Sequence, residues 1–397
     1  MSSASSTVLP GLTGDPGQPV ALGVMGGGQL GRMFVHAAQS LGFRTVVLDP
    51  DTDSPAGAVA HEQVRTDYLD GEGLARLQQQ CLAITTEFEN VPAQALERLA
   101  AGRTVAPSAA AVAVCQDRAL EKAAFTRCGV ACAPHALIET QAQLEAVPEA
   151  LLPGILKTAR LGYDGKGQVR VRDRAGLAQA WLDLKQAPCV LEAMLPLAHE
   201  VSVVLARNAQ GEVVTFPVQE NVHRDGILAV TQVPSPNVPQ EAQQEALAHA
   251  RKMADSLDYV GVLCVEFFVL QDGRVVANEM APRPHNSGHY TIDACDQSQF
   301  DLQVRAVAGL PLVVPRLHSA AVMLNLLGDL WFDAQGQERT PPWASVLALP
   351  GVHLHLYGKS SARRGRKMGH LTVTAATPER ARELALKAAA GLGLPAF

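Results

Sequence analysis

Short apolar runs alternate with amphipathic helical patterns over residues 20–107. The runs VALGVM, RTVVLD and CLAITTE predict buried strands, and the patterns around them predict helices at 29–41, 71–80 and 92–101. Because strands that alternate with helices pair through right-handed crossovers, a parallel α/β sheet is expected here. A Ser-, Gly- and Pro-rich stretch over residues 1–18 precedes it and is interpreted as a disordered tail.

Shorter elements fill the rest of the chain. Two helices are expected in APSAAAVAVCQDRALEKAAFTRCGV, with Asp117 as the N-cap of the second. The runs GILKTA, GQVRVR, CVLEAML and EVSVVLARN predict strands, and a helix is expected at 239–257. GVLCVEFFVL and VVANEM predict a hairpin with an Asp272–Gly273 turn. The C-terminal part adds the strands AAVMLNLLG, VHLHLYGK and GHLTVTA and a closing helix, PERARELALKAAAGL.

The composition is that of an ordinary globular protein. Of 397 residues, 47% are apolar and 18% are charged, which allows two or three domains. The net charge of −6 argues against a nucleic-acid-binding protein, since such proteins usually carry a basic excess. No apolar run approaches the ~20 residues of a membrane span. The chain shows no signal-peptide pattern, and its seven cysteines lack disulfide or zinc spacing, so a cytoplasmic protein is expected.

The stretch GVMGGGQLGRM places Gly26, Gly28 and Gly31 in a G-x-G-x-x-G pattern after the first predicted strand. Asp49 follows 18 positions after Gly31, near the spacing at which an acidic residue binds a ribose hydroxyl. By itself this pattern indicates an NAD-dependent dehydrogenase. A dehydrogenase, however, leaves the carboxylates and the basic cluster of this chain unexplained.

The predicted hairpin carries two acidic residues inside apolar runs, Glu266 in LCVEFFV and Glu279 in VANEMA, with Asn278 beside the second. Facing strands bring such side chains together, and paired carboxylates form a hard oxygen site suited to Mg²⁺. The alternative is a pair of solvated strand residues. Because an unpaired carboxylate is costly to bury, magnesium with a polyphosphate explains the pattern better.

The segment KTARLGYDGKGQ joins two predicted strands through a glycine-rich loop. Its glycines, Gly162, Gly165 and Gly167, let backbone amides approach phosphate oxygens, and Lys157 and Lys166 could neutralise phosphate charge. The Walker pattern is absent, and a plain tight turn is the alternative reading.

Two polar segments complete the candidate chemistry. In NEMAPRPHNSGH, His285 and His289 lie four residues apart, but the flanking prolines disfavour a helical zinc site, so a loop that donates hydrogen bonds to an anionic substrate is expected. In YGKSSARRGRKMGH, a local basic cluster is either a solvated run or a phosphate anchor. The cluster consists of Lys359, Arg363, Arg364, Arg366 and Lys367.

Together these segments resemble the ATP-grasp superfamily, and within it the N5-carboxyaminoimidazole ribonucleotide synthetases. The matching stretches are GGGQLGRM, TTEFENVP, QDRALEK, GYDGKGQ, ENVHRDGIL, VEFFV, NEMAPRPHNSGH and HLYGK with GRKMGHL. The resemblance implies an α/β and α+β architecture: a Rossmann-like pre-ATP-grasp domain over 19–117, an ATP-grasp domain over 118–309 with a lid near 133–195, and a small β-rich domain over 310–397.

The resemblance also implies a reaction. ATP, Mg²⁺ and bicarbonate would carboxylate 5-aminoimidazole ribonucleotide by way of carboxyphosphate, and the family is commonly homodimeric. The nearest alternative is the formate-dependent phosphoribosylglycinamide formyltransferase of the same superfamily; a dehydrogenase is an alternative of a different class. Neither nucleic acid nor membrane is an expected partner.

For the nucleotide, the resemblance assigns the magnesium ion to Glu266 and Glu279, with help from Asn278. The phosphates are assigned to Arg118, Lys157 and a loop that would close over them. The loop consists of Gly162, Tyr163, Asp164, Gly165, Lys166, Gly167 and Gln168. Adenine and ribose are assigned to the end of the CVLEAML strand, namely Glu192, Ala193, Met194 and Leu195. Glu200 and His223 are assigned to the same pocket.

For the acceptor, the resemblance assigns residues from the first glycine loop, the RPHNSGH segment and the basic cluster. These are Gln29, Leu30, Glu87, Asn286, Ser287, Lys359, Arg366 and Lys367. The glycine loop is expected to cradle the ribose phosphate with its amides. Catalytic roles are expected for Tyr163, Asp164, Arg283, His285 and Lys359. The choice between Glu87 and Glu89, the roles of Arg363 and Arg364, and the general base stay open, with Asp164 or a phosphate oxygen as candidates.

Overall fold

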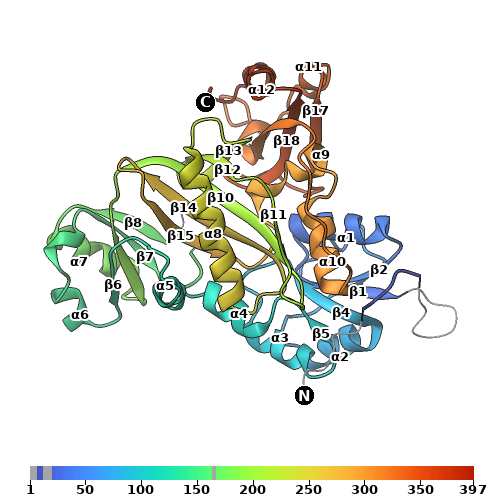
Figure 1. Ribbon diagram of the computed structural model, residues 1–397, viewed down its shortest axis with the longest axis horizontal. Helices are drawn as coiled ribbons and strands as arrows, with labels where there is room; N and C mark the ends of the chain where they lie inside the picture. Colours follow the sequence, from blue (N-terminus) through green and yellow to red (C-terminus); the bar gives the residue numbers. More distant parts are fainter. Residues whose placement is uncertain (1–6, 12–19, 163–166) are drawn as a thin grey trace.

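A computed structural model describes residues 7–11, 20–162 and 167–397 (Figure 1). Its N-terminal part is a five-stranded parallel sheet of order β3-β2-β1-β4-β5, as the alternating pattern predicts. The strands are β1 (Ala21–Met25), β2 (Arg44–Leu48), β3 (Glu62–Val64), β4 (Cys81–Thr86) and β5 (Thr104–Val105). Helices α1 (Gln29–Ser40), α2 (Gly71–Gln80) and α3 (Ala93–Ala100) flank this sheet and lie where the periodicity predicts them.

Two helices lead from this sheet into the next part of the chain, α4 (Ala109–Cys115) and α5 (Arg118–Arg127). Asp117 caps α5 as predicted, because its carboxylate accepts hydrogen bonds from the amides of Ala119 and Leu120 at 3.0 and 3.3 Å. This cap fixes where α5 begins, and thereby sets the direction of the side chains in its first turn.

A separate four-stranded antiparallel sheet of order β6-β9-β7-β8 forms the subdomain at the left of Figure 1. Its strands are β6 (His135–Ile138), β7 (Gly154–Thr158), β8 (Gln168–Val171) and β9 (Cys189–Ala193). Helices α6 (Gln141–Glu145) and α7 (Arg174–Asp183) and the 3₁₀ turn η1 (Glu149–Leu151) complete it. Leu156, Trp181 and Leu191 lie in its own apolar core, which makes it a compact unit inside the expected lid region.

The largest sheet has nine strands and runs through the middle and the C-terminal part, in the order β15-β14-β10-β12-β13-β16-β18-β17, with β11 paired to β10. Its strands in the middle part are β10 (Leu197–Arg207), β11 (Val213–Thr215), β12 (Gln219–Arg224), β13 (Ile227–Val233), β14 (Gly261–Leu270) and β15 (Val275–Ala281). Its C-terminal strands are β16 (Ala320–Leu327), β17 (Val352–Leu356) and β18 (Lys367–Ala375). Because β13 pairs with β16, the C-terminal strands continue the central sheet.

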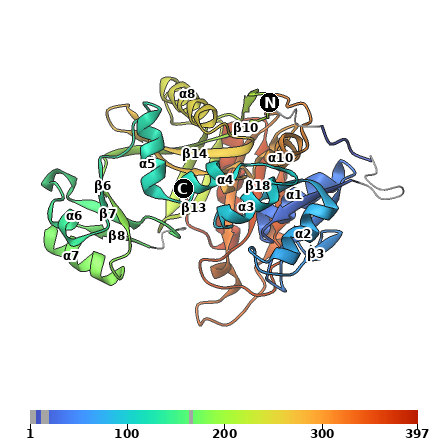
Figure 2. The ribbon, with the colours of Figure 1, turned by 90° about the horizontal axis from the view of Figure 1, so that it is seen from below.

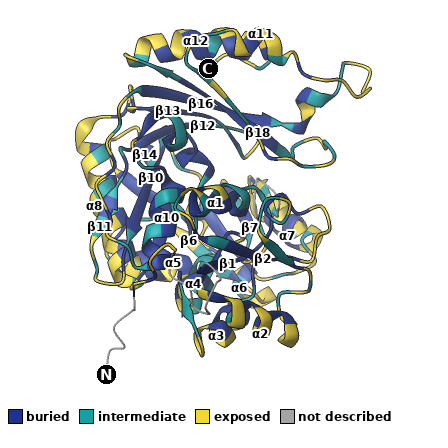
Figure 3. Ribbon diagram, turned by 90° about the vertical axis from the view of Figure 1, so that its right-hand side faces the viewer, coloured by how far each residue is buried: buried dark blue, intermediate teal, exposed yellow. Residues whose placement is uncertain are grey.

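Helices cover this sheet on the sides that carry apolar residues. Helix α8 (Gln240–Ser256) packs small residues such as Ala246 and Ala250 against β10 and β14. Helix α10 (Gln299–Ala308) contacts both α1 and the central strands, so it joins the N-terminal part to the rest (Figure 2). Helix α12 (Pro378–Leu392) covers the C-terminal strands, and its outer side carries most of its exposed residues (Figure 3).

Short elements complete the fold: the helices α9 (Thr291–Ala294) and α11 (Trp343–Leu347) and the 3₁₀ turns η2 (Asn286–Gly288) and η3 (Gly328–Trp331). No helix among the described residues is long and apolar enough to cross a membrane. The predicted hairpin is present as β14–β15, and Gly273 at its turn has φ +88°, a conformation that favours glycine. The β12–β13 hairpin and α10 are elements that the sequence patterns did not predict.

Candidate active site

Glu266 on β14 and Glu279 on β15 lie close enough to act on each other's ionisation, as the hairpin pattern predicts, with side chains 12% and 41% exposed. Burial raises the pKa of Glu266 to about 7, and the nearby Glu279 and Glu200 carboxylates add to the shift against the charge of His223. Burial also opposes ionisation of Glu279, but Arg118, Lys157 and Lys122 lower its pKa to about 2. Glu279 is therefore ionised at neutral pH, whereas Glu266 is present in both its charged and its neutral form.

Arg118, in the first turn of α5, connects the hairpin to the glycine-rich loop. Its Nη1 lies 2.9 Å from Glu279 Oε2, and its Nη2 donates to the carbonyl of Gly162 at 3.3 Å. The Asp117 cap directly before it fixes this position. Arg118 therefore lies where the carboxylate pair meets the described start of the loop.

A buried group of three charges lies behind this point. Lys157 Nζ and Lys122 Nζ contact the two oxygens of Glu192 at 2.8 and 3.0 Å. Burial opposes ionisation of Glu192, but the two ammonium groups lower its pKa to about 2. The Glu192 side chain thus holds both lysines, and its expected place beside adenine or ribose stays a prediction.

Lys122 is a site residue that the sequence reasoning missed. Its side chain is fully buried, and its Nζ donates to the carbonyl of Asn278 at 2.9 Å. Lys122 lies four positions after Arg118 on α5, and residues at that spacing share one helix face. The four-residue spacing of Arg118 and Lys122 in QDRALEK could therefore have indicated that Lys122 faces the same site.

The segment after β9 uses much of its backbone for internal hydrogen bonds. The amides of Ala193 and Met194 donate to the carbonyls of Pro134 and Pro153, and the Leu195 carbonyl accepts from Leu197. The Met194 side chain is 46% exposed, which leaves an apolar surface beside the site.

Glu200 and His223 form the pair that was predicted for the nucleotide pocket. They come from the neighbouring strands β10 and β12 and contact each other through Glu200 Oε2 and His223 Nδ1. Burial disfavours a charged imidazole, but Glu200, Glu266 and Glu279 raise the pKa of His223 to about 9. A positive imidazolium therefore borders the hairpin carboxylates.

The RPHNSGH segment lies against the same carboxylates. His285 Nε2 is 3.3 Å from Glu266 Oε1, while His285 Nδ1 accepts from the amide of Ser287. Burial, with the charges of Arg283 and Lys367, lowers the pKa of His285 well below its ordinary value, so the neutral ring donates toward Glu266. Ser287 is fully buried, and its hydroxyl forms hydrogen bonds with the side chains of His285 and Ser202. Ser287 therefore supports His285 from the interior of the protein.

Two further residues of this segment have distinct surroundings. Arg283 forms an ion pair with Glu89. Glu89 and Glu87 therefore have different partners, since Glu87 accepts hydrogen bonds from backbone amides. Asn286 is 6% exposed, and neither polar atom of its side chain has a hydrogen-bond partner among the described residues. Because unpaired buried polar atoms are costly, Asn286 is a candidate for contact with a ligand.

Three amides of the first glycine loop have acceptors within the chain. Glu87 accepts from the amides of Gly28 and Gly31 at 2.8 and 3.1 Å, and Asp49 accepts from Gly27 at 2.7 Å. Two carboxylates therefore accept from three of the loop amides, and their negative charge would oppose an added anion at those amides. The phosphate-cradle role of this loop stays a prediction.

The two residues predicted to face the acceptor after this loop have different surroundings. Leu30 is 7% exposed and packs in the core of the N-terminal part, so its side chain is part of the interior. Gln29 opens α1 and is partly exposed.

The basic cluster lies in the loop between β17 and β18, where the strand pattern predicts it, and ends at Lys367, the first residue of β18. Lys359 Nζ donates to the carbonyl of Lys367 at 2.6 Å, and Arg366 Nη1 donates to the carbonyl of Ser361 at 2.8 Å. The positive charge of Lys367 helps to lower the pKa of His285, so this end of the loop lies near the RPHNSGH segment. Arg364 instead lies 3.7 Å from Asp329 and packs over the ring of Phe332.

Four predicted loop residues, Tyr163, Asp164, Gly165 and Lys166, lie outside the described residues. On either side of them, Gly162 accepts from Arg118, and the Gly167 carbonyl accepts from the amide of Thr158 at 2.8 Å. Gln168 pairs with Lys157 across β7 and β8, so the loop starts and ends beside Lys157.

An antiparallel subdomain that carries Lys157 beside a carboxylate hairpin is the arrangement of an ATP-grasp enzyme. The chain matches the family model of the ATP-grasp domain over residues 123–300. Residues 20–116 match the ribonucleotide synthetase preATP-grasp domain, and residues 321–384 match the phosphoribosylaminoimidazole carboxylase C-terminal domain.

Within this class, the chain belongs to the N5-carboxyaminoimidazole ribonucleotide synthase family. It is 46% identical over 354 residues to the synthase of Brucella melitensis, a match that covers 88% of this chain and 95% of the relative. The synthase of Bacillus subtilis is 41% identical over 352 residues, with 88% and 90% covered.

Solved structures agree with this assignment. An ADP complex of an N5-carboxyaminoimidazole ribonucleotide synthetase has a TM-score of 0.87 and 38% identity, covering 97% of this chain and 98% of that one. The Aspergillus clavatus enzyme in complex with ADP and 5-aminoimidazole ribonucleotide has a TM-score of 0.85 and 33% identity, covering 94% and 98%.

Proposed function

We propose that this chain is an ATP-dependent ligase of purine biosynthesis that carboxylates the amino group of 5-aminoimidazole ribonucleotide, with bicarbonate as the carbon source. The observation that carries the proposal is the shared site of Glu266, Glu279, Arg118 and Lys157, where paired carboxylates lie next to buried cations. Membership in the synthase family supports the substrate, and the relative with bound ADP and 5-aminoimidazole ribonucleotide supports both ligands.

Magnesium fits the residues at the hairpin. The pKa of Glu266 is raised to about 7, and a divalent cation would relieve that cost of burial. Asn278 Oδ1 is buried and has no hydrogen-bond partner within the described part of the chain. Carboxylate and amide oxygens are hard donors suited to Mg²⁺, so Glu266 and Glu279 would hold the ion with Asn278 beside them. When bound, magnesium would offset charge on the ATP phosphates.

The cations of this site are suited to the nucleotide. Arg118 and Lys157 would contact the phosphates, and Lys122 would hold Glu192 in place so that Lys157 keeps its position. Glu200 and His223, with the segment Ala193–Leu195, would contact the ribose and adenine. Lys166 and the loop around it would close over the phosphates and exclude water from a short-lived intermediate.

The acceptor would lie between the RPHNSGH segment and the basic loop. Lys359, Arg366 and Lys367 would bind its phosphate, a role suited to long cationic side chains in a loop. Asn286 would contact the base or ribose, which would satisfy its unpartnered amide. Gln29 and Glu87 would face the same ligand from the N-terminal part, with Glu87 kept in place by the α1 amides.

The chemistry would proceed in two displacements. A bicarbonate oxygen attacks the γ-phosphorus of ATP, the bond to ADP breaks, and carboxyphosphate forms. The amino group of the ribonucleotide then attacks the carboxyl carbon, directly or after release of CO₂, and phosphate leaves. Asp164 and a phosphate oxygen are both candidates to accept the amine proton. Arg283 and the neutral His285 would position groups around Glu266.

The decisive assay measures ADP release with ATP, bicarbonate and 5-aminoimidazole ribonucleotide, and then omits each substrate in turn. Full turnover is expected only with all three. Formate with glycinamide ribonucleotide replaces bicarbonate and its acceptor in a parallel reaction. Turnover with that pair alone would favour the formyltransferase instead, and an absorbance change with NAD would favour a dehydrogenase.

We further propose that the domains extend over 19–117, 118–309 and 310–397, that the enzyme is a homodimer, and that it acts in the cytoplasm. Light scattering of the purified chain tests the dimer. A monomer at the working concentration would contradict it.

A further inference from the structure

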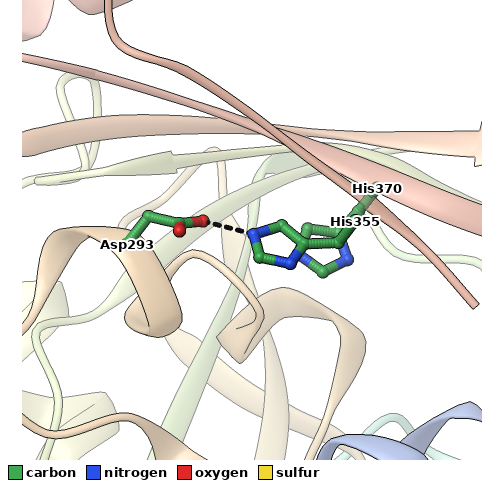
Figure 4. Close-up of side chains that lie close together, drawn as sticks. All are labelled: Asp293, His355 and His370. Atoms are coloured by element: carbon green, nitrogen blue, oxygen red, sulfur yellow. Dashed lines mark hydrogen bonds and ion pairs between the residues drawn. The ribbon is translucent and has the colours of Figure 1, made fainter.

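A cluster of histidines lies where the central part of the chain meets the C-terminal strands, apart from the hairpin carboxylates. Asp293 comes from α9, His355 from β17 and His370 from β18 (Figure 4). One potential ligand atom of each residue lies within 4.8 Å of the others. The cluster therefore joins two regions of the chain through groups that bind metals.

The backbone register explains how the sequence builds this cluster. His355 and His370 are directly opposite each other on the antiparallel strands β17 and β18. His353 lies two positions before His355, so both side chains share one face of β17. His353 Nδ1 lies 3.6 Å from Asp293 Oδ1, and His355 Nε2 lies 2.8 Å from Asp293 Oδ2.

One ring nitrogen of the cluster has no hydrogen-bond partner among the described residues. His370 is fully buried, and its Nδ1 contacts the hydroxyl of Tyr357 at 3.0 Å. Its Nε2 is buried and has no hydrogen-bond partner among the described residues. An interdomain contact between Asp293 and His355 alone would leave this nitrogen unsatisfied, which is costly in a protein interior.

We propose that Asp293, His355 and His370 form a binding site for a divalent transition metal of the Zn²⁺ type, with His353 as a further ligand. Imidazole nitrogens and a carboxylate are the usual nitrogen and oxygen ligands of zinc. Ligand atoms at 2.0–2.1 Å from a tetrahedral ion lie about 3.4 Å apart, so the cluster needs only a modest contraction. This ion would be a second metal, in addition to the magnesium proposed at Glu266 and Glu279.

Metal binding requires one change in the side chains. The rings of His355 and His370 are stacked, with centroids 4.5 Å apart and planes at 12°. Because an imidazole nitrogen binds a metal in the plane of its ring, one ring has to turn. The His355 side chain is 29% exposed, and its outer torsion has a broad energy profile, so this ring is the one that turns.

The bound ion would hold β17 and β18 against α9. The loop between these two strands carries Lys359 and Arg366, so the ion would also fix the base of the predicted phosphate anchor. Its role would be structural, because the donors present can fill its coordination positions.

The test titrates Zn²⁺ into the full-length protein without nucleotide and counts the ions retained per chain after desalting. We expect one retained ion in the wild type. Asp293→Asn and His355→Ala should each lower the affinity by more than the roughly 10–100-fold that loss of an outer-shell partner costs. His61→Ala, which alters an exposed histidine of the N-terminal part, is the matched control and should bind normally.

Thermal unfolding provides a second readout, since Zn²⁺ should raise the melting temperature of the wild type and not that of Asp293→Asn. His370→Asn is informative only if circular dichroism shows that it folds, so the proposal relies on the two more accessible residues. Absence of a retained ion in the wild type would overturn the proposal. Binding that survives both substitutions but is lost in Cys132→Ser would overturn it too, because Cys132 Sγ lies 3.9 Å from His135 Nδ1.

Discussion

Two pairs of carboxylates among the described residues differ in their surroundings. Asp49 and Glu87, beside the first glycine loop, accept hydrogen bonds from three backbone amides, Gly27, Gly28 and Gly31. Glu279, on the β14–β15 hairpin, has one close arginine, and the contacts of Glu266 with other described residues are at 3.3–3.4 Å to His285 and Asn278.

The difference supports the proposal that the second pair, rather than the first, binds a cation. Backbone amides already stabilise the first pair, so the glycine loop is an internal support for α1. The second pair lacks enough donors, and its two charges oppose each other, which is why the pKa of Glu266 is raised to about 7. In the proposed function, a divalent cation would supply positive charge at the second pair, whereas the first pair already has backbone donors.

The largest expected effect concerns the charges behind the hairpin. Glu192→Gln leaves Lys122 and Lys157 buried without their carboxylate, and breaking a buried ion pair costs about 3–5 kcal/mol. The folded-state pKa of Glu192 is about 2, below its ordinary 4.5, so its contribution to stability is present above pH 4.5 and is lost as the pH falls toward 2. Urea unfolding at pH 7 and at lower pH measures both effects. Equal stability of the variant and the wild type at pH 7 would contradict the buried charge group.

Glu279→Gln tests the cation site itself. We expect ADP release to fall by roughly 10²–10³-fold, because a group that stabilises transition-state charge is lost while the fold remains. Glu383→Gln, an exposed carboxylate on α12, is the control and should retain activity. Turnover close to that of the wild type in Glu279→Gln would argue against the metal role.

Lys359→Ala separates the two substrates. Loss of a charged hydrogen bond of about 1.5–3 kcal/mol should raise the KM for the ribonucleotide at least tenfold and leave that for ATP nearly unchanged. Arg364→Ala is the matched control, since its side chain contacts Asp329 and Phe332 instead. Equal increases in both KM values would reject the phosphate-anchor assignment.

Glu87→Gln addresses the first carboxylate pair. The variant should lose about 1–3 kcal/mol of stability, because one α1 amide loses its carboxylate acceptor. The loss should not depend on Mg²⁺, in contrast to effects at the hairpin. A stability difference that magnesium removes would show that the two carboxylate pairs have been assigned the wrong way round.

The parts of the site that the sequence predicts are those built by local patterns. Glu266 and Glu279 stand out because they interrupt apolar strands, and the Asp272–Gly273 turn brings those strands together. Asp117 is recognisable as a cap from its place before a helical pattern. In these cases the periodicity of one or two neighbouring elements determines where the side chains meet.

The parts that it does not predict depend on contacts between distant segments. A glycine fingerprint indicates accessible amides but does not say which group accepts their hydrogen bonds. Here the acceptor is Glu87, which lies 59 positions after Gly28 and 56 after Gly31. The role of Glu192 depends on Lys122, which comes from a helix outside its own sheet. Strand β12 lacks a recognisable apolar alternation, because its buried residues Gln219, Glu220 and Asn221 are polar.

The most direct test of the account is a Mg²⁺ titration of nucleotide binding to the wild type and to Glu266→Gln, measured calorimetrically with a non-hydrolysable ATP analogue. The account predicts that magnesium tightens binding to the wild type and has a much smaller effect on the variant. Equal tightening in both proteins would contradict the claim that the hairpin carboxylates hold the ion.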